Sequence, residues 1–94
     1  MGLRFEWDPR KADANLKKHG ITFQEATTVF ADALSITIPD PEHSEGEARF
    51  LDLGLSHRHR LLVVSYTERG KVIRIISARR ASRSERKTYE SKGY

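Results

Sequence analysis

Apolar and polar residues recur with a helical spacing in the first third of the chain and with a strand spacing in most of the rest. The boundaries of a first helix are clear in the sequence. Asp8 is a good N-cap, Pro9 suits the first helical position, and Gly20 suits the left-handed residue that follows a helix. Because its interior is mostly polar, this helix is expected to cover the surface rather than fill the core.

A second helix is predicted directly afterwards. Thr22 and Glu25 have the spacing of a capping box, in which each side chain bonds the backbone amide of the other residue. The positions at i, i+3, i+4 and i+7 form a stripe that faces the core: Phe23, Ala26, Thr27 and Phe30. The chain is therefore expected to open with a helical hairpin.

Strand patterns occupy most of the remaining sequence. A short β-branched segment at 34–38 ends at prolines, and three longer segments follow at 48–56, 60–67 and 72–79. Their connections are short, so neighbouring strands should pair in an antiparallel meander. The segment at 60–67 is apolar on both faces, which is typical of a central strand. Residues 3–7 alternate weakly and form a possible short leading strand.

The last helix is predicted from a second capping box, formed by Ser82 and Glu85, and runs to about residue 92. These elements predict an α+β fold with an N-terminal helical hairpin, an antiparallel sheet of about four strands and a C-terminal helix. Since the chain has 94 residues, a single domain over 1–94 is expected.

Composition excludes several kinds of chemistry. The chain has no cysteine, which rules out disulfides, thiolate metal sites and a cysteine nucleophile. Metal-binding and nucleotide-binding motifs such as HExxH, the Walker loop and GxGxxG are also absent from the sequence, so neither a metal nor a cofactor is expected. No apolar run has the length of a membrane span or the character of a signal peptide, and a cytoplasmic protein is expected.

Positive charge is concentrated at the C-terminal end. Residues 74–94 hold seven lysines and arginines against two glutamates, a net charge of +5, whereas the whole chain carries +4. The first 73 residues therefore carry −1. A local positive field of this kind is typical of a protein that binds a nucleic acid or an acidic protein.

The arginines of the segment 72–80 are the first candidates for anion binding. Strict strand alternation would place Arg74 and Arg80 on one face and Arg79 on the other. Arg74 lies among isoleucines, where an arginine must be paired, extended to the surface or directed into a wet cleft. Arg49 occupies a similar place on another strand. Ion pairs of these arginines with nearby acids are an equally simple explanation.

RNA would give such arginines a chemical task. A ribose 2′-OH can attack its own phosphodiester without a metal if cations stabilise the phosphorane and two protons are moved. Glu85 and Tyr89 are spaced i, i+4 on one helix face and are candidates for moving protons. Glu85 has a competing role in the capping box, and Tyr89 can simply cover the core. His19 near the end of the first helix also fits a favourable interaction with the helix dipole.

Four segments together resemble a known family: "FEWDPRKADANLKKHGITFQEATTVF", "EARFLDLG", "RLLVVSYTERG" and "IRIISARRASRSERKTYE". They are similar, in the same order and over nearly the whole chain, to the BrnT toxins of type II toxin–antitoxin systems. The resemblance implies a RelE-like fold and a metal-independent endoribonuclease that inhibits translation. It also implies a BrnA-type antitoxin with a ribbon-helix-helix DNA-binding domain, in a two-toxin, two-antitoxin complex that binds promoter DNA through the antitoxin.

The active surface of RelE-like folds lies beside the last strand and the C-terminal helix. By position, the resemblance implies these catalytic residues: Arg49, Arg74, Arg79, Arg80, Glu85, Tyr89 and His19. The residues expected to bind RNA are Lys18, Arg83, Arg86 and Lys87. The alternative function is a non-catalytic module whose basic surface binds nucleic acid or the antitoxin and acts only in promoter repression. Cleavage of RNA in the presence of a chelator would separate the two.

Overall fold

The computed structural model of the chain describes residues 3–43 and 46–92. The helices and strands are β1 (Arg4–Glu6), α1 (Pro9–His19), α2 (Phe23–Thr28), β2 (Ile36–Pro39), β3 (Arg49–Leu55), β4 (Leu61–Arg69), β5 (Val72–Arg80) and α3 (Arg83–Lys92). Two short 3-10 turns complete them: η1 (Val29–Ala31) and η2 (Pro41–His43). All the predicted helices and strands are therefore present, with boundaries that differ by one or two residues.

The start and end of α1 follow from its flanking residues, as predicted. The Asp8 carboxylate accepts a hydrogen bond of 2.9 Å from the backbone amide of Arg10, and Pro9 occupies the first turn. Gly20 adopts a φ of +71°, a left-handed conformation that costs glycine little, and its amide donates to Leu16. The chain therefore turns sharply after α1 and leads directly into α2.

The start of α2 matches only half of its predicted capping box. The Thr22 hydroxyl accepts from the Glu25 amide at 3.0 Å. Among the hydrogen bonds of residues 3–43 and 46–92, however, the Glu25 carboxylate accepts from Ser56 and Arg60, which lie on the turn between β3 and β4. Glu25 is 2% exposed. Its side chain thus ties α2 to a distant turn instead of closing the local cap.

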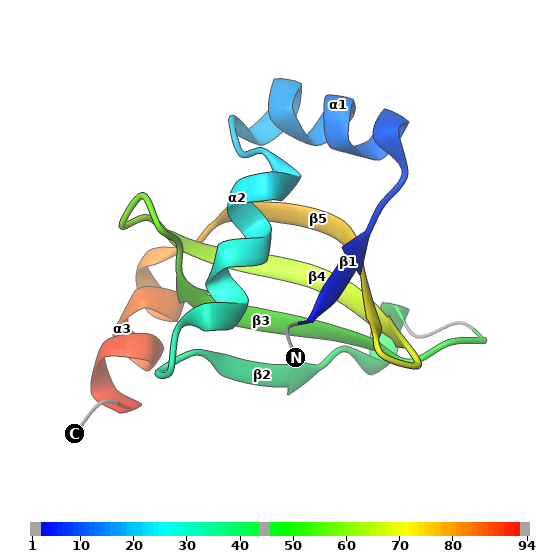
Figure 1. The fold of residues 1–94 in the computed structure, drawn as a ribbon. Coiled ribbons are helices and arrows are strands. Elements are labelled where there is room, and N and C mark those ends of the chain that lie inside the picture. Colours follow the sequence, from blue (N-terminus) through cyan, green and yellow to red (C-terminus); the bar gives the residue numbers. More distant parts are fainter. Residues whose placement is uncertain (1–2, 44–45, 93–94) are drawn as a thin grey trace.

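The sheet contains five strands in the order β1-β5-β4-β3-β2 (Figure 1). The strands from β2 to β5 pair with antiparallel neighbours, as the short connections predicted. The leading strand β1 adds a fifth strand that runs parallel to β5, from Arg4 opposite Val72 to Glu6 opposite Arg74. The sheet is therefore mixed, and the first and last strands of the chain are neighbours.

One residue of β5 has no counterpart on β4. Ser77 lies opposite Ser65 and Ile75 lies opposite Tyr66, so Ile76 is the extra residue of a β-bulge. A bulge bends its strand and interrupts the alternation of side chains between the two faces. The side chains before and after Ile76 therefore do not follow a single alternating series.

This bulge overturns one prediction about the arginines. Arg74 lies opposite Thr67 and Arg79 lies opposite Val63, and these two partners are four residues apart on β4. Arg74 and Arg79 therefore share one face of the sheet, whereas Arg80 points to the other. The prediction that Arg74 and Arg80 share a face was wrong because the extra residue reverses the alternation. The prediction that Arg79 and Arg80 point apart is confirmed.

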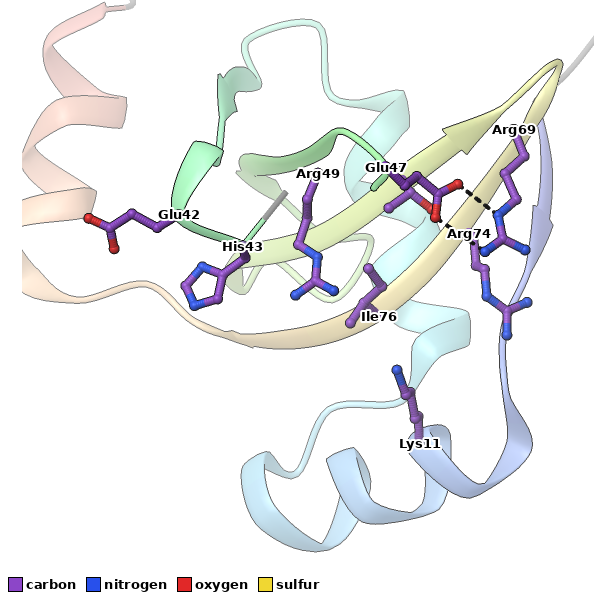
Figure 2. A pocket seen from close by; sticks show the side chains of 9 residues that line it. Lys11, Glu42, His43, Glu47, Arg49, Arg69, Arg74 and Ile76 are labelled. Atoms are coloured by element: carbon purple, nitrogen blue, oxygen red, sulfur yellow. Dashed lines mark hydrogen bonds and ion pairs between the residues drawn. The ribbon is translucent and has the colours of Figure 1, made fainter. Parts of the chain in front are cut away.

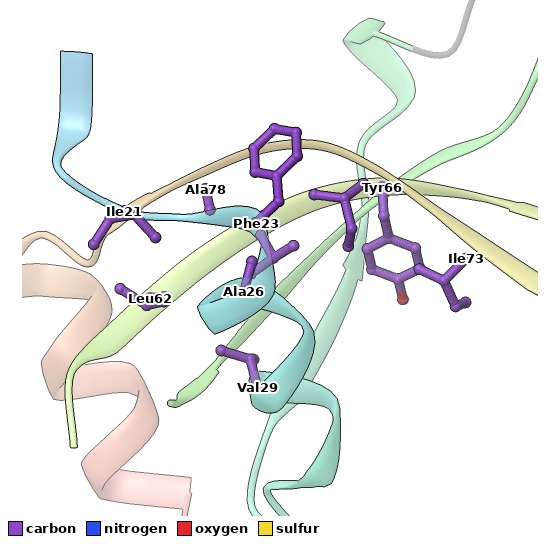
Figure 3. Packing of buried hydrophobic residues seen from close by; sticks show 10 residues of the cluster. Ile21, Phe23, Ala26, Val29, Leu62, Tyr66, Ile73 and Ala78 are labelled. Carbon is purple, nitrogen blue, oxygen red and sulfur yellow. The ribbon is translucent and has the colours of Figure 1, made fainter. Parts of the chain in front are cut away.

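Each face of the sheet carries an apolar cluster. The larger one lies on the face covered by α2 (Figure 3): Ile21, Phe23, Ala26, Val29, Leu62, Val64, Tyr66, Ile73, Ile75 and Ala78. The smaller one lies on the other face: Ile36, Leu53, Leu61 and Val63, with Ala81 and Tyr89 packed against it. We call this second side the α3 face. Arg49, Thr67 and Arg74 lie further along the same face.

Candidate nucleic-acid interface

Two adjoining hollows lie along β5 and α1. The first, which we call the arginine hollow, has a volume of about 410 Å³ and is lined by Lys11, Glu42, His43, Glu47, Arg49, Thr67, Arg69, Arg74 and Ile76. The second, the lysine hollow, has a volume of about 220 Å³ and is lined by Lys11, Ala14, Asn15, Lys18, His19, Ile76 and Ser77. Because Lys11 and Ile76 line both, the two hollows adjoin, and we refer to them together as the basic groove.

The arginine hollow is built on a row of residues across three strands. Arg49 on β3 lies opposite Thr67 on β4, which in turn lies opposite Arg74 on β5. Residues directly opposite each other point to the same face with their Cβ atoms about 4.5–5.5 Å apart. Figure 2 shows Arg49 and Lys11 pointing toward one another across the hollow, with Ile76 between them. Cationic groups from the sheet and from α1 thus converge on the same space.

Carboxylates offset part of this charge. Arg74 donates to Glu6 at 2.9 Å, and Arg69 donates to Glu47 at 2.9 Å. The hydrogen bond from Arg69 lowers the pKa of Glu47, and Arg74 and Arg49 add to this effect through their charges. Lysine and arginine nevertheless outnumber glutamate around the arginine hollow by four to two. The hollow keeps a net positive charge and favours an anion.

The lysine hollow depends on a buried asparagine that holds α1 against β5. The Asn15 side chain donates to the carbonyls of Ile21 and Ala78 at 3.0 and 2.9 Å, and its oxygen accepts from the Ala78 amide at 3.0 Å. Its amide thus pairs with β5 much as a neighbouring strand would. Lys18 and His19, two of the predicted site residues, lie on the next turn of α1 and line this hollow.

Three predicted catalytic residues take part in contacts that fix α3. Arg79 donates two hydrogen bonds to Glu85, of 2.8 and 2.9 Å, and the Ser82 amide donates to the same carboxylate at 2.7 Å. The hydrogen bonds from Arg79 are the main reason that the pKa of Glu85 falls to about 2. The predicted capping box of α3 is thereby confirmed, and Glu85 is a weak base.

Tyr89, one turn further along α3, is also held in place. Its hydroxyl donates to the Asp32 carboxylate at 2.6 Å, while its ring packs against the apolar cluster of the α3 face. Burial, with a contribution from Asp32, raises the pKa of Tyr89 to about 12. The tyrosine therefore anchors α3 and gives up its proton only with difficulty.

The described structure divides the predicted residues into two groups. Four of them line the basic groove: Lys18, His19, Arg49 and Arg74. The others line neither hollow: Arg79, Arg80, Arg83, Glu85, Arg86, Lys87 and Tyr89. For both groups, the assignment to catalysis or RNA binding remains a prediction.

Sequence reasoning missed three residues of the groove. Lys11 is one of many polar residues on its helix, so the sequence does not distinguish it from a residue exposed to solvent. Asn15 could not be recognised either, because Ala78, with which it makes two of its three hydrogen bonds, is distant in sequence. Thr67 closes a strand that is apolar on both faces, and its place between two arginines depends on strand register. Only the spacing of Lys11, Lys18 and their neighbours on α1 could have suggested a shared basic helix face.

Residues 3–43 and 46–92 hold no group of three or more histidine, aspartate or glutamate side chains placed to bind a metal ion. In the same residues, no helix is both long enough and apolar enough to cross a membrane.

A mixed sheet with a basic groove beside its last strand defines a small α+β protein suited to binding an anionic chain. Among solved structures, the chain resembles the 1.1 Å crystal structure of the Brucella abortus ribonuclease toxin BrnT, with a TM-score of 0.68 and 21% sequence identity over 87% of this chain and 100% of that one. No curated protein matches the chain. The family model described as "Ribonuclease toxin, BrnT, of type II toxin-antitoxin system" matches residues 7–85. The chain belongs to this family, which confirms the resemblance, and a type II toxin has an antitoxin as its partner.

Proposed function

We propose that this protein is a metal-independent endoribonuclease whose substrate lies in the basic groove. The observation that carries the proposal is the convergence of Arg49, Arg74 and Lys11 on one hollow in a chain of the BrnT family. An RNA strand is a chain of phosphates, and guanidinium groups bind phosphate through two parallel hydrogen bonds. The groove therefore matches the substrate in both charge and donor geometry.

The chemistry follows from the groups in the groove. The 2′-OH of a ribose attacks the adjacent phosphorus and loses its proton, and the 5′-oxygen of the next nucleotide leaves and takes up a proton. Arg49 and Arg74 stabilise the negative charge of the phosphorane between these steps. His19 moves one of the two protons, and the adjacent Lys18 holds the strand. No cofactor takes part.

The cellular role follows from the family. Cleavage of RNA, free or on the ribosome, inhibits translation and growth in the cytoplasm. A BrnA-type antitoxin with a ribbon-helix-helix domain neutralises the toxin in a complex of two toxins and two antitoxins, which represses its promoter through the antitoxin. We also propose that the fold is related to that of the RelE toxins.

The direct test is RNA degradation by the purified protein in excess EDTA. We expect cleavage by the wild-type protein and a loss of at least about a hundredfold when Arg49 and Arg74 are both changed to alanine, because two charge-assisted contacts are removed. Arg58→Ala is a control for the loss of a positive charge outside the groove, since Arg58 is exposed on a turn that lines neither hollow. Circular dichroism and melting curves establish that each variant is folded. RNA that survives intact with the wild-type protein would disprove the catalytic proposal.

The second candidate function is binding without cleavage. It is favoured by the engagement of Glu85 and Tyr89, two of the predicted proton-moving residues, in contacts that hold α3. In that case EDTA-treated protein leaves RNA intact but retains it on a filter, with an affinity that falls steeply as salt rises. Growth arrest on expression, relieved by the antitoxin, would then be absent.

A further inference from the structure

Thr67 is a buried polar residue with an unusual pair of neighbours. It lies opposite Arg49 on one side and Arg74 on the other, on the α3 face of the sheet, and it lines the arginine hollow. The bulge at Ile76 produces this arrangement. Without the extra residue, the pairing that continues from Ser77 would place Ile75 opposite Thr67.

Among the described residues, the hydroxyl of Thr67 has no acceptor for its proton. Thr67 is only 3% exposed, and its Oγ1 atom has no hydrogen-bond partner within residues 3–43 and 46–92. A threonine hydroxyl both donates and accepts hydrogen bonds, whereas a guanidinium group only donates. The two neighbouring arginines are therefore of the wrong type to receive the hydroxyl proton. Burial of a polar group without a partner is unfavourable, so the site is incomplete as it stands.

An anion supplies the acceptor that the Thr67 hydroxyl needs. A phosphate group carries only acceptor oxygens, so it can accept from two guanidinium groups and from the hydroxyl between them. It also offsets the positive charge that Arg49 and Arg74 bring to the two sides of Thr67. Arg74 already donates to the carboxylate of Glu6, and Arg69 donates to that of Glu47. The guanidinium groups of this hollow can therefore donate to the oxygen atoms of an anion.

We propose that Thr67 is a positioning residue that binds one phosphate group of the RNA strand together with Arg49 and Arg74. This inference rests on the proposed ribonuclease function, because it identifies the ligand of the same groove. Thr67 lines the hollow and its hydroxyl is buried, so the proposal requires the long arginine side chains to turn toward the anion and open a path to this hydroxyl. The role of Thr67 is to fix one phosphate in register along the groove.

The test separates the hydroxyl from the shape of the side chain. Thr67→Val keeps the volume and removes the hydroxyl, whereas Thr67→Ser keeps the hydroxyl. The probes are inorganic phosphate and adenosine 3′-monophosphate, whose binding is measured by calorimetry in the presence of EDTA. We expect Thr67→Val to weaken the binding of both by about tenfold, as for the loss of one hydrogen bond to a charged group, and Thr67→Ser to bind like the wild type. Because the hydroxyl has no protein partner, Thr67→Val should melt at the wild-type temperature or above.

Each outcome decides the inference separately from the ribonuclease function. If Thr67→Val binds both probes as tightly as the wild type, or if the wild type binds neither, the phosphate site is refuted even in a protein that cleaves RNA. If Thr67→Val loses phosphate binding and Thr67→Ser keeps it, the phosphate site stands. If, in addition, neither the wild type nor the variants cleave RNA, the catalytic proposal fails. In an active enzyme, Thr67→Val should raise the KM for a short RNA more than it lowers kcat.

Discussion

Replacement of Asn15 by alanine tests how α1 is attached to the sheet. Its side chain makes three hydrogen bonds, of 2.9–3.0 Å, to the backbone of Ile21 and Ala78, and it is 6% exposed. Asn15→Ala removes all three bonds and leaves buried backbone groups without partners, at about 1–3 kcal/mol for each group that water does not reach. Alanine offsets up to about 0.7 kcal/mol through its higher helix propensity. We expect a net loss of about 3 kcal/mol.

That loss is large for a chain of 94 residues, whose free energy of unfolding should be about 5–14 kcal/mol. In a domain of this size each kcal/mol lowers the melting temperature by about 4–8 °C, so Asn15→Ala should melt about 12–24 °C below the wild type. Urea titration should show a lower midpoint with an unchanged slope, because the fold itself is retained.

The control is Asp13→Ala on the same helix. Asp13 is exposed, so its replacement brings the gain in helix propensity without the loss of a buried contact. A second comparison is Asn15→Asp, which keeps the acceptor for Ala78 but directs a carboxylate at two carbonyls and should be no more stable than the alanine variant. If Asn15→Ala melts within about 3 °C of the wild type, the asparagine does not hold α1 in place, and the account of the lysine hollow fails with it.

Three further predictions concern carboxylates. Glu47→Gln should bind RNA about two- to fivefold more tightly in filter assays, since it removes an anion that competes for the arginine hollow. Glu85 has a folded-state pKa of about 2, below its ordinary value of 4.5, so it stabilises the fold above pH 4.5 and this contribution disappears as the pH falls from 4.5 to 2. Glu85→Gln should therefore melt lower at pH 7 and depend less on pH across that window. Asp52 behaves in the opposite way, because burial raises its pKa from 3.8 to about 6, so its contribution is present below pH 3.8 and is lost as the pH rises through 6. Asp52→Asn should melt higher than the wild type at pH 7.

Each of these predictions has a direct counter-result. Glu90→Gln makes the same charge change as Glu47→Gln on the exposed surface of α3, and equal RNA affinities for the two variants would show that Glu47 does not compete. If the melting temperatures of Glu85→Gln and the wild type change with pH in the same way between pH 2 and 7, the ion pair of Glu85 with Arg79 adds no stability. A lower melting temperature for Asp52→Asn at pH 7 would mean that the Asp52 carboxylate is better accommodated than its burial implies.

Local signals in the sequence predicted the helices well because their causes lie within a few residues. Asp8, Thr22 and Ser82 each cap a helix through an amide two or three positions away. Glu25 shows where such reasoning ends. Its spacing fits a local cap, but Arg60, 35 residues further along, offers a stronger partner. For the Glu25 carboxylate, a charged donor that the tertiary fold supplies outweighed a neutral backbone amide that is close in sequence.

The candidate site was predictable only in part for a similar reason. Arg49 and Arg74 were identified as isolated cations on strands, and the fold brings them to one hollow. The bulge at Ile76, which decides the face of each arginine, depends on how two strands pair and leaves no local mark in the sequence. Thr67 gains its significance from the same pairing, so it could not be identified without the register.

The pairing of β1 with β5 has a consequence for the order in which a newly made chain becomes active. The groove takes Lys11, Lys18 and His19 from α1 near the start of the chain and Arg74 from β5 near its end. A ribosome-bound chain that has not yet released β5 therefore has neither hollow, and its N-terminal helices lack the strand on which they pack. Binding of phosphate in the groove would therefore arise only after β5 has been synthesised and released. Stalled chains of increasing length should become resistant to protease, and able to bind phosphate, only when β5 has emerged. Binding by shorter chains would refute this order of events.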